Sequence, residues 1–522
     1  MDATDAVDAA ERDLNGRPGR SGQARRTLLA AGLGAVLVGG AALFAPEEGA
    51  RPERAPSSDV RAVGPGGRSA VQELGALIRD REAHVRAHPE DARAWAVLGS
   101  AYVARGAARA DSAYFPKAER ALRRALDGPR AAGSAGAAGL SGSAGAVGSA
   151  GAVGSVGSVD ASEKAAGPKG AAGRGEDAKP RERGGVGGPA AVPAKALREG
   201  LAGLASLAVA RHDYATAKRW GETLRARQPR LWTSHAVLVD AYTGLGDHRA
   251  AGRALDELSK LRSGAPVLLR TARVFRDRGW REDAEAKADE AAARAGSPAE
   301  KAAALRLLGE LAWERGEPAV SLAHYDAALA TVQDEPAARA GRARALAALG
   351  RTAEAYTDYL SALDRLPSPE IMLELGELYD SERLDGDART QYARLRAQAA
   401  RARRDGVNEE LVLARYEADH GDARSAVRRL RGEWNHGRRS LAVADALGWA
   451  LYRAGETKEA LAYAKRATGQ GTRSALYAYH RGEIERALGM RSAARLHLEE
   501  ALRTNPHFSP LLAPRAREGL RG

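Results

Sequence analysis

Seven glycines recur at nearly equal spacing in the C-terminal half of this chain, and they constrain its fold more than any other feature. They are Gly246, Gly279, Gly316, Gly350, Gly421, Gly455 and Gly489. The intervals are 33, 37, 34, 71, 34 and 34 residues, so the interval of 71 spans two repeats whose shared glycine is missing. Five residues after each glycine comes a very small side chain: Ala251, Ala284, Ser321, Ala355, Ala426, Ala460 or Ala494. This period predicts an all-α solenoid of stacked helical hairpins, in which each glycine adopts a left-handed backbone at the end of a first helix.

The composition narrows the chemistry that such a solenoid can carry. Among 522 residues there is no cysteine, which excludes disulfides, thiolate catalysis and cysteine-bound zinc. The formal net charge is +13, but arginine and glutamate are interspersed, as on solvated helix faces. A nucleic-acid-binding protein would gather its positive charge beside a known reading module, so we expect no nucleic-acid partner. The sequence indicates no cofactor and no small-molecule substrate.

An uncharged segment near the N-terminus predicts a transmembrane helix or signal anchor. Residues 27–45 contain no charged side chain, and a helix of that length spans roughly 28 Å, about the hydrocarbon thickness of a bilayer. Pro46 follows it and disfavours cleavage, so we favour an uncleaved anchor; the alternative is secretion after signal cleavage. Arginines are more frequent before the segment than after it. We therefore expect a disordered basic tail (1–26) in the cytoplasm and residues 46–522 outside it, in a single-pass cell-membrane protein.

The next part of the chain contains a tether, a first hairpin and a linker. A tether at 46–68 leads to a helix and hairpin over 69–127, in which Trp95, Leu98, Gly99 and Tyr102 have the spacing W-x2-L-G-x2-Y. The turn inside this hairpin is expected to be about seven residues longer than usual. Residues 128–191 are low in complexity and bury too little apolar surface to offset the entropy of ordering, which predicts a disordered linker. We expect the first hairpin to dock on the second, the alternative being an undocked hairpin.

The W-x2-L-G-x2-Y spacing, followed by Ala118, Leu122 and Ala125, resembles the tetratricopeptide repeat (TPR) family. The resemblance covers roughly 92–127 and 197–507, and Leu375-Gly376-x2-Tyr379 repeats it closely. It implies about ten helical hairpins, with the main array over 192–507 and a capping helix over 508–522. It also implies that the first helices line a concave groove, where proteins or peptides bind.

Motifs typical of catalysis or metal binding are missing from the sequence. There is no phosphate-cradling glycine loop, no G-x-S-x-G and no H-E-x-x-H. His84 and His88 are four residues apart, but Pro89 frays that helix end and no third ligand is near, so we predict no metal site. The repeats continue to within about fifteen residues of the C-terminal residue. We therefore expect no catalytic domain and no enzymatic activity.

Charge alternates along the expected groove. One residue past the small residue of each first helix stand Asp240, Arg273, Glu310, Arg344, Glu377 and Arg415, followed by Trp449 and Glu483. One hypothesis is a structural set of ion pairs between repeats, each worth about 0–1 kcal/mol. The other is a zwitterionic groove that hydrogen-bonds a bound peptide. We favour the structural hypothesis, because exposed ion pairs are commonly incidental.

Aromatic and arginine side chains on the same helices give the candidate partner-binding site. Trp449, Tyr452, Arg453 and Tyr479 are expected to face the groove, with Arg486 nearby and Trp313 on an earlier first helix. Exposed Trp, Tyr and Arg dominate interface energies, although each can instead pack between helices. The lysine and asparagine that chaperone-binding TPR proteins use to clamp a carboxy-terminus are missing from these helices, which disfavours that kind of partner.

The sequence therefore predicts a membrane-anchored TPR scaffold or adaptor that binds proteins or peptides. One alternative comes from the segment HPEDARAWAVLGSAYVARG after an anchor and an amphipathic helix, which is similar to cytochrome c maturation factors. That resemblance covers about 70–127 and implies an assembly chaperone for apoproteins. A second alternative is an exported accessory subunit of an enzyme complex.

Overall fold

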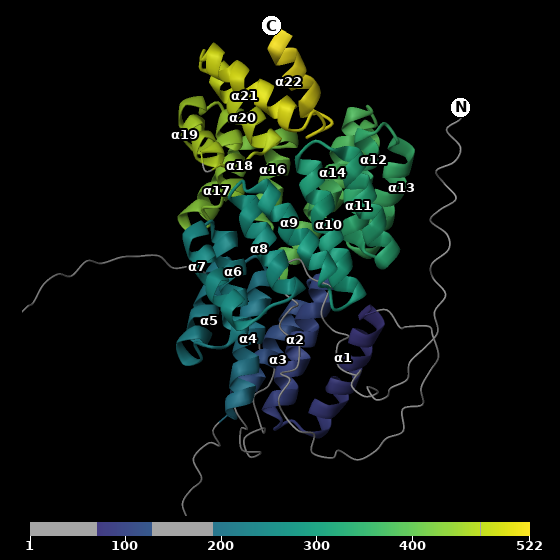
Figure 1. Ribbon diagram of the computed structural model, residues 1–522, viewed down its shortest axis with the longest axis vertical. Helices are drawn as coiled ribbons and strands as arrows, with labels where there is room; N and C mark the ends of the chain where they lie inside the picture. The colour runs from purple at the N-terminus through teal and green to yellow at the C-terminus, as the bar shows by residue number, and fades with distance from the viewer. Residues whose placement is uncertain (1–69, 128–191, 470, 522) are drawn as a thin grey trace, which may run out of the picture.

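The described part of the chain is helical throughout. The structure, a computed structural model, describes residues 70–127, 192–469 and 471–521, and in these ranges it contains 22 α-helices and no strand (Figure 1). The tail at 1–26, the uncharged segment at 27–45, the tether at 46–68 and the linker at 128–191 lie outside the described residues. One helix, α1 (Ala70–Ala87), precedes the hairpins, and another, α22 (Leu512–Arg521), follows them.

Ten hairpins lie between α1 and α22, and each pairs a first helix with a second helix. Units 1 to 5 are α2 (Ala92–Arg109) with α3 (Tyr114–Asp127), α4 (Ala194–Ala210) with α5 (Tyr214–Arg227), α6 (Trp232–Leu245) with α7 (His248–Leu261), α8 (Ala265–Asp277) with α9 (Arg281–Ala293), and α10 (Pro298–Glu314) with α11 (Pro318–Thr331). Units 6 to 10 are α12 (Pro336–Ala348) with α13 (Thr352–Arg365), α14 (Pro369–Ser381) with α15 (Asp385–Arg404), α16 (Glu410–His420) with α17 (Ala423–Asn435), α18 (Leu441–Arg453) with α19 (Thr457–Thr468), and α20 (Ala475–Ala487) with α21 (Arg491–Thr504).

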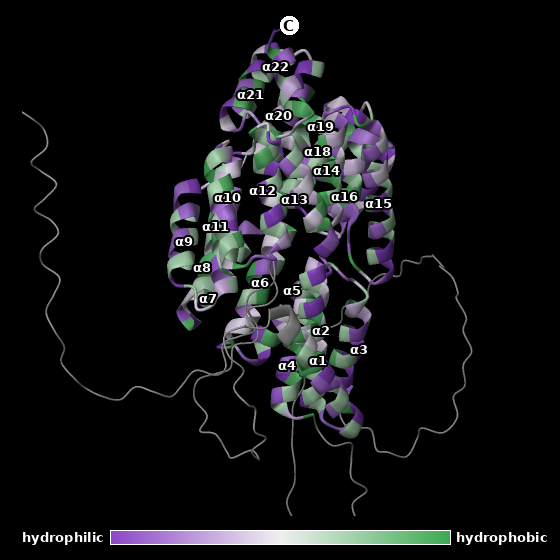
Figure 2. Ribbon diagram, turned by 90° about the vertical axis from the view of Figure 1, so that its right-hand side faces the viewer, coloured by the Kyte–Doolittle hydropathy of each residue, from purple (hydrophilic) through white to green (hydrophobic). Residues whose placement is uncertain are grey.

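Small residues hold the two helices of each unit close together. The seven small residues that follow the turn glycines are all buried, as predicted. On the first helix, a Cβ added to Gly376 would lie 2.4 Å from Cε1 of Tyr392 on the second helix, too close for any other residue type. Apolar and polar residues alternate along the helices in Figure 2, because each helix packs against neighbours on one side and meets water on another.

The turn between the two helices is left-handed in nine of the ten units. Six of the seven glycines have φ between 75° and 88°, which a residue without Cβ adopts at little cost. Arg383 (φ 61°) occupies the position of the missing glycine between Gly350 and Gly421, and His212 and Ala110 do the same in units 2 and 1. The expectation for Gly421 is wrong: its φ is −146°, because the chain leaves α16 through an extended residue and Asp422 then caps α17.

Two further expectations about helix ends need correction. The turn in unit 1 is not unusually long, because the additional residues extend the first helix, α2, to 18 residues. The capping helix begins at Leu512 rather than Phe508. The hydroxyl of Ser509 accepts a hydrogen bond from the backbone amide of Leu512 (3.2 Å), which fixes the start of the helix there. Phe508 instead packs on the ring of Tyr479, with 5.5 Å between ring centroids.

The array curves back on itself, so that its second half lies against its first. We call units 1–5 the first coil and units 6–10 the second coil. Figure 1 shows α17 and α18 of the second coil above α6, α7 and α8 of the first. The turn of each unit from 2 to 5 meets the loop that follows the unit five places later. We call this line of contacts the coil seam.

Hydrogen bonds at the coil seam satisfy carbonyls at the ends of first-coil helices. The amide of Asn408 donates to the carbonyl of Arg211 (2.8 Å), the amide of Arg439 to Leu245 (3.0 Å), the Thr472 hydroxyl to Asp277 (2.8 Å) and the Asn505 side-chain amide to Trp313 (2.7 Å). The last carbonyls of a helix have no partner within it. The second coil therefore caps the first helices of units 2 to 5.

The first hairpin docks on the second, as expected. Residues 128–191, which separate the two hairpins in sequence, lie outside the described residues. A Cβ added to Gly203 of α4 would lie 2.3 Å from the Leu122 side chain of α3, so the two units are in close contact. Arg211 pairs with Glu119 at 2.6 Å. The hydroxyl of Ser112 also donates to Asp405 of the second coil at 2.6 Å. Unit 1 is thus attached to both coils.

Candidate partner-binding surfaces

The residues of alternating charge lie on the inner face of the solenoid, and Asp240, Glu310 and Arg344 form ion pairs with residues other than one another. Asp240 pairs with Arg270 at 2.8 Å, and Arg344 pairs with Glu374 at 3.1 Å. Both pairs join adjacent first helices and are separated by 30 residues rather than 34. Neighbouring first helices are therefore offset by one helical turn, which brings residue i next to residue i + 30.

Glu310 and Glu377 have different surroundings on this face. Burial raises the pKa of Glu310, but nearby Arg306, Arg276, Arg273 and Arg344 together lower it below its ordinary value. Arg306 contacts Glu310 directly, and Arg276 lies 3.6 Å away. Glu377 lies 3.8 Å from His420 of the next first helix. The inner face thus contains a structural network of ion pairs, as favoured from the sequence.

Two of the predicted arginines have no carboxylate partner among the described residues. Arg415 on α16 is exposed. Arg273 on α8 is half-buried; burial and the neighbouring Arg306 lower its pKa to about 10. A guanidinium remains protonated at neutral pH. Arg273 and Arg415 therefore present positive charges on the inner face that the protein does not neutralise by direct contact.

Two aromatic members of the candidate partner-binding site are not exposed. Trp449 is 5% exposed and Tyr479 is 2% exposed. The ring of Trp449 stacks on His480 at 4.1 Å, and its Nε1 donates to Asp419 of α16 at 2.9 Å. Tyr479 is covered by Phe508. The expectation that both rings are exposed to a partner is wrong, because each fills the space between successive units.

Tyr452, Arg453 and Arg486 remain accessible in this region. Arg453 pairs with Asp419 at 2.7 Å, and Arg486 pairs with Glu483 at 2.7 Å. Tyr452 is half-buried against Trp449, with 5.1 Å between ring centroids. Arg453 and Arg486 are thus the exposed members of the predicted site, and Tyr452 is partly exposed beside the buried ring of Trp449.

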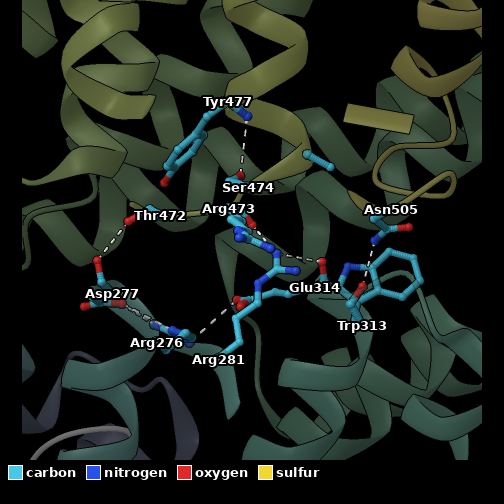
Figure 3. Close-up of a pocket in the computed structure, with 11 residues that line it drawn as sticks. Arg276, Asp277, Arg281, Trp313, Glu314, Thr472, Arg473, Ser474, Tyr477 and Asn505 are labelled. Carbon is cyan, nitrogen blue, oxygen red and sulfur yellow. Dashed lines mark hydrogen bonds and ion pairs between the residues drawn. The ribbon is translucent and has the colours of Figure 1, made fainter. Parts of the chain in front are cut away.

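A pocket of about 220 Å³ opens at the coil seam, and Trp313 is one of its walls (Figure 3). The first coil contributes Arg276, Asp277, Arg281, Trp313 and Glu314; the second contributes Thr472, Arg473, Ser474, Ala475, Tyr477 and Asn505. Arg276 interacts with Asp277 at 3.2 Å and with Glu314 at 3.9 Å. Burial raises the pKa of Glu314 more than Arg276 lowers it.

Of the predicted site residues, the structure places Trp313 in this seam pocket and leaves Tyr452, Arg453 and Arg486 on the second coil. Sequence reasoning missed Arg276, Arg281, Arg473 and Tyr477, because the pocket joins residues almost 200 positions apart. The loop GQGTRS before α20 was the available signal, since two glycines precede a capping serine there.

The Nε2–H of His84 donates to the Asp91 carboxylate at 3.0 Å, and no group of three or more side chains that could hold a metal ion occurs among the described residues. None of the helices in the described ranges combines the length and the apolar character that a membrane crossing requires. The predicted anchor at 27–45 is outside those ranges.

Comparison with known proteins identifies solved structures only. No protein-family model matches the chain, and no curated protein matches it. A tetratricopeptide repeat protein from Parabacteroides merdae ATCC 43184 is 20% identical, with a TM-score of 0.30, over 49% of this chain and 97% of that one. Pseudomonas aeruginosa PilF is 18% identical (TM-score 0.32; 38% and 90% of the chains), and yeast Tom70 is 11% identical (0.34; 86% of each).

The chain's own helices define its fold. It consists of ten hairpins, nine of them with left-handed turns, and has buried small residues after the turn glycines at a spacing near 34 residues. The fold is a TPR-type solenoid.

Proposed function

We propose that this chain is a protein-interaction scaffold that binds an extended segment of a partner protein along its inner face. The observation that supports this most directly is the row of half-exposed charged and aromatic side chains on successive first helices. Among them are Arg273 and Arg415, which form no direct ion pair with a carboxylate of the described residues. Solenoids present such surfaces to extended ligands, with side chains fixed in advance by the packing of each repeat. The proposal assigns the chain no catalytic step.

Photo-crosslinking in cells tests where the partner binds. A photo-crosslinking amino acid at position 415 lies on the inner face, and the same residue at position 424 lies on the exposed side of a second helix. We expect one or more proteins to be captured from position 415 and not from position 424. Identical capture from both positions, or no capture at all, would contradict the proposal.

We further propose that residues 27–45 anchor the scaffold in the cell membrane, with the repeats on the extracytoplasmic side. The support is the uncharged length of the segment and the arginines before it. Alkaline extraction of membranes should leave the full chain in the pellet and release a variant without residues 27–45. External protease should degrade the repeats in spheroplasts. Recovery of the intact full chain in the soluble fraction would refute the anchor.

A further inference from the structure

The seam pocket has an excess of positive charge that the protein does not pair. Its walls contain three arginines and two carboxylates, and both carboxylates interact with Arg276. Arg281 donates only to the backbone carbonyls of Glu314 (3.4 Å) and Arg473, and the exposed Arg473 side chain has no carboxylate partner among the described residues. In the described residues, neither Arg281 nor Arg473 therefore forms an ion pair with a carboxylate.

The surroundings of Arg281 make an anion favourable there. Burial lowers the pKa of Arg281, and the nearby Arg473 and Arg315 lower it further, against the effect of Glu314. A negative group would offset this repulsion and form charge-assisted hydrogen bonds with planar guanidinium donors. The first turn of α20 begins at the same pocket, with Ser474 as its N-cap, so the positive end of that helix dipole also lies at the pocket.

The size and walls of the pocket favour one acidic side chain over a larger ligand. Its volume of about 220 Å³ is below the 300–1,000 Å³ that is typical of sites for whole small molecules. Trp313 and Tyr477 provide apolar walls that suit the methylene groups of a glutamate or aspartate. A free inorganic anion would leave these aromatic surfaces uncovered.

We propose that the seam pocket binds a glutamate or aspartate side chain of the partner segment, and that this carboxylate holds the two coils together. Arg281 comes from the first coil and Arg473 from the second, so a carboxylate between them contacts both. The inference rests on the proposed scaffold function and specifies what the partner must contain. By mass action, a ligand that binds only the closed seam stabilises that closure.

Binding is tested with the full chain in mild detergent and fluorescein-labelled twelve-residue peptides blocked at both ends. One peptide carries two glutamates, and its matched control carries two glutamines. We expect the glutamate peptide to bind at least tenfold more tightly, and Arg473→Gln to weaken its binding about tenfold, the effect of losing one charge-assisted hydrogen bond. Arg424→Gln changes the net charge equally on an exposed second helix and should leave binding unchanged.

Hydrogen exchange provides the second measurement. The backbone amides of Asn408 and Arg439 donate across the seam outside the pocket, so their exchange rates report seam opening. The glutamate peptide should slow both amides in the native chain and not in Arg473→Gln. Inorganic phosphate, tested alone at the same concentrations, should not reproduce the effect; if it does, the pocket is a general anion site and the proposal is wrong.

Other results separate this proposal from the scaffold function. Equal affinity for the glutamate and glutamine peptides, absence of binding, or binding insensitive to Arg473→Gln would each overturn the pocket assignment. If a partner were still captured at position 415 in those cases, the scaffold would stand and only the carboxylate site would fall. If position 415 captured no partner in either the native chain or Arg473→Gln, the scaffold function itself would be refuted.

Discussion

At the level of single residues, the turn glycines have two different environments. A Cβ added to Gly246, Gly279 or Gly316 would lie between 1.9 and 2.8 Å from backbone atoms of the second coil. Around Gly350, Gly455 and Gly489 there is open space. All six have a positive φ. The first three glycines therefore serve both the turn within a unit and the close approach of the two coils.

Alanine substitutions separate these two roles. Gly455→Ala should cost about 1–2 kcal/mol, the penalty of a left-handed alanine. Gly279→Ala should cost more, because its methyl group would meet the carbonyl of Gly471. Thermal unfolding gives the relative stabilities. Exchange of the Arg439 amide should be faster in Gly279→Ala alone; equal exchange in the two variants would mean that the seam does not depend on Gly279.

Substitution of Trp449 should lower the stability of the fold, and any effect on partner binding should follow from that loss. Trp449→Ala removes a buried ring and should destabilise units 8–10 by about 3–5 kcal/mol. Trp449→Phe keeps most of the ring but loses the hydrogen bond to Asp419, which should lower the free energy of unfolding by about 1 kcal/mol. Differential scanning calorimetry measures both. A wild-type transition for Trp449→Ala would contradict its structural role.

The residues that repeat are the ones that the sequence predicts well. The 34-residue period locates the hairpins, the buried small residues and the inner-face charges, because each of these depends on contacts within a unit or with its neighbour. The environment of Trp449 was not predictable in this way, since Asp419 and His480 become its partners only through the one-turn offset between first helices. The seam contacts of Thr472 and Asn505 join residues 195 and 192 positions apart, which a period of 34 residues does not indicate.

At the level of elements, the loop between α15 and α16 is a titratable part of the seam. Asn408 in this loop bonds to Arg211, and Glu409 follows it. Burial, and then the neighbouring Glu370, raise the pKa of Glu409 to about 8, although Arg438 opposes the shift. Burial lowers the pKa of His212 on the facing turn. The two groups therefore respond to pH in opposite directions.

Stability should fall as the pH rises through the Glu409 transition. The raised pKa means that the folded state binds a proton more tightly than the unfolded state. The stabilisation is therefore complete below about 4.5 and lost as the pH rises to about 8. His212, with its lowered pKa, contributes mainly below about 6.5. Between pH 7 and 8.5 the melting temperature should decrease, and Glu409→Gln should remove most of that slope. An unchanged slope in the variant would exclude Glu409 as its source.

At the level of the whole molecule, contacts between the coils supplement contacts between neighbouring units. In an open solenoid each repeat touches only the next, and stability is nearly a sum over neighbours. Here unit 1 shares one apolar cluster with unit 2 and with Ala402 and Val407 of the second coil. Docking of the first hairpin therefore depends on side chains distant in sequence rather than on the covalent connection at 128–191.

Cutting that connection should leave the protein assembled. A protease site inserted within residues 128–191 allows cleavage of the folded chain. We expect the fragment with unit 1 to remain bound to the rest, because Leu122 and Glu119 contact unit 2 and Ser112 contacts Asp405. Size-exclusion chromatography after cleavage measures this, and Leu122→Asp should release the fragment. Separation of the native fragments would show that the linker holds unit 1 in place.

The coil seam also restricts how such a chain can change in length. A solenoid whose repeats touch only their neighbours tolerates the gain or loss of a repeat. In this chain the turns of units 2 to 5 each meet a loop five units further on, with matched donors and closely approaching glycines. Duplication or deletion of unit 6 would place every one of these turns opposite the wrong loop. The contacts at the coil seam thus fix the number of repeats between the contacting positions.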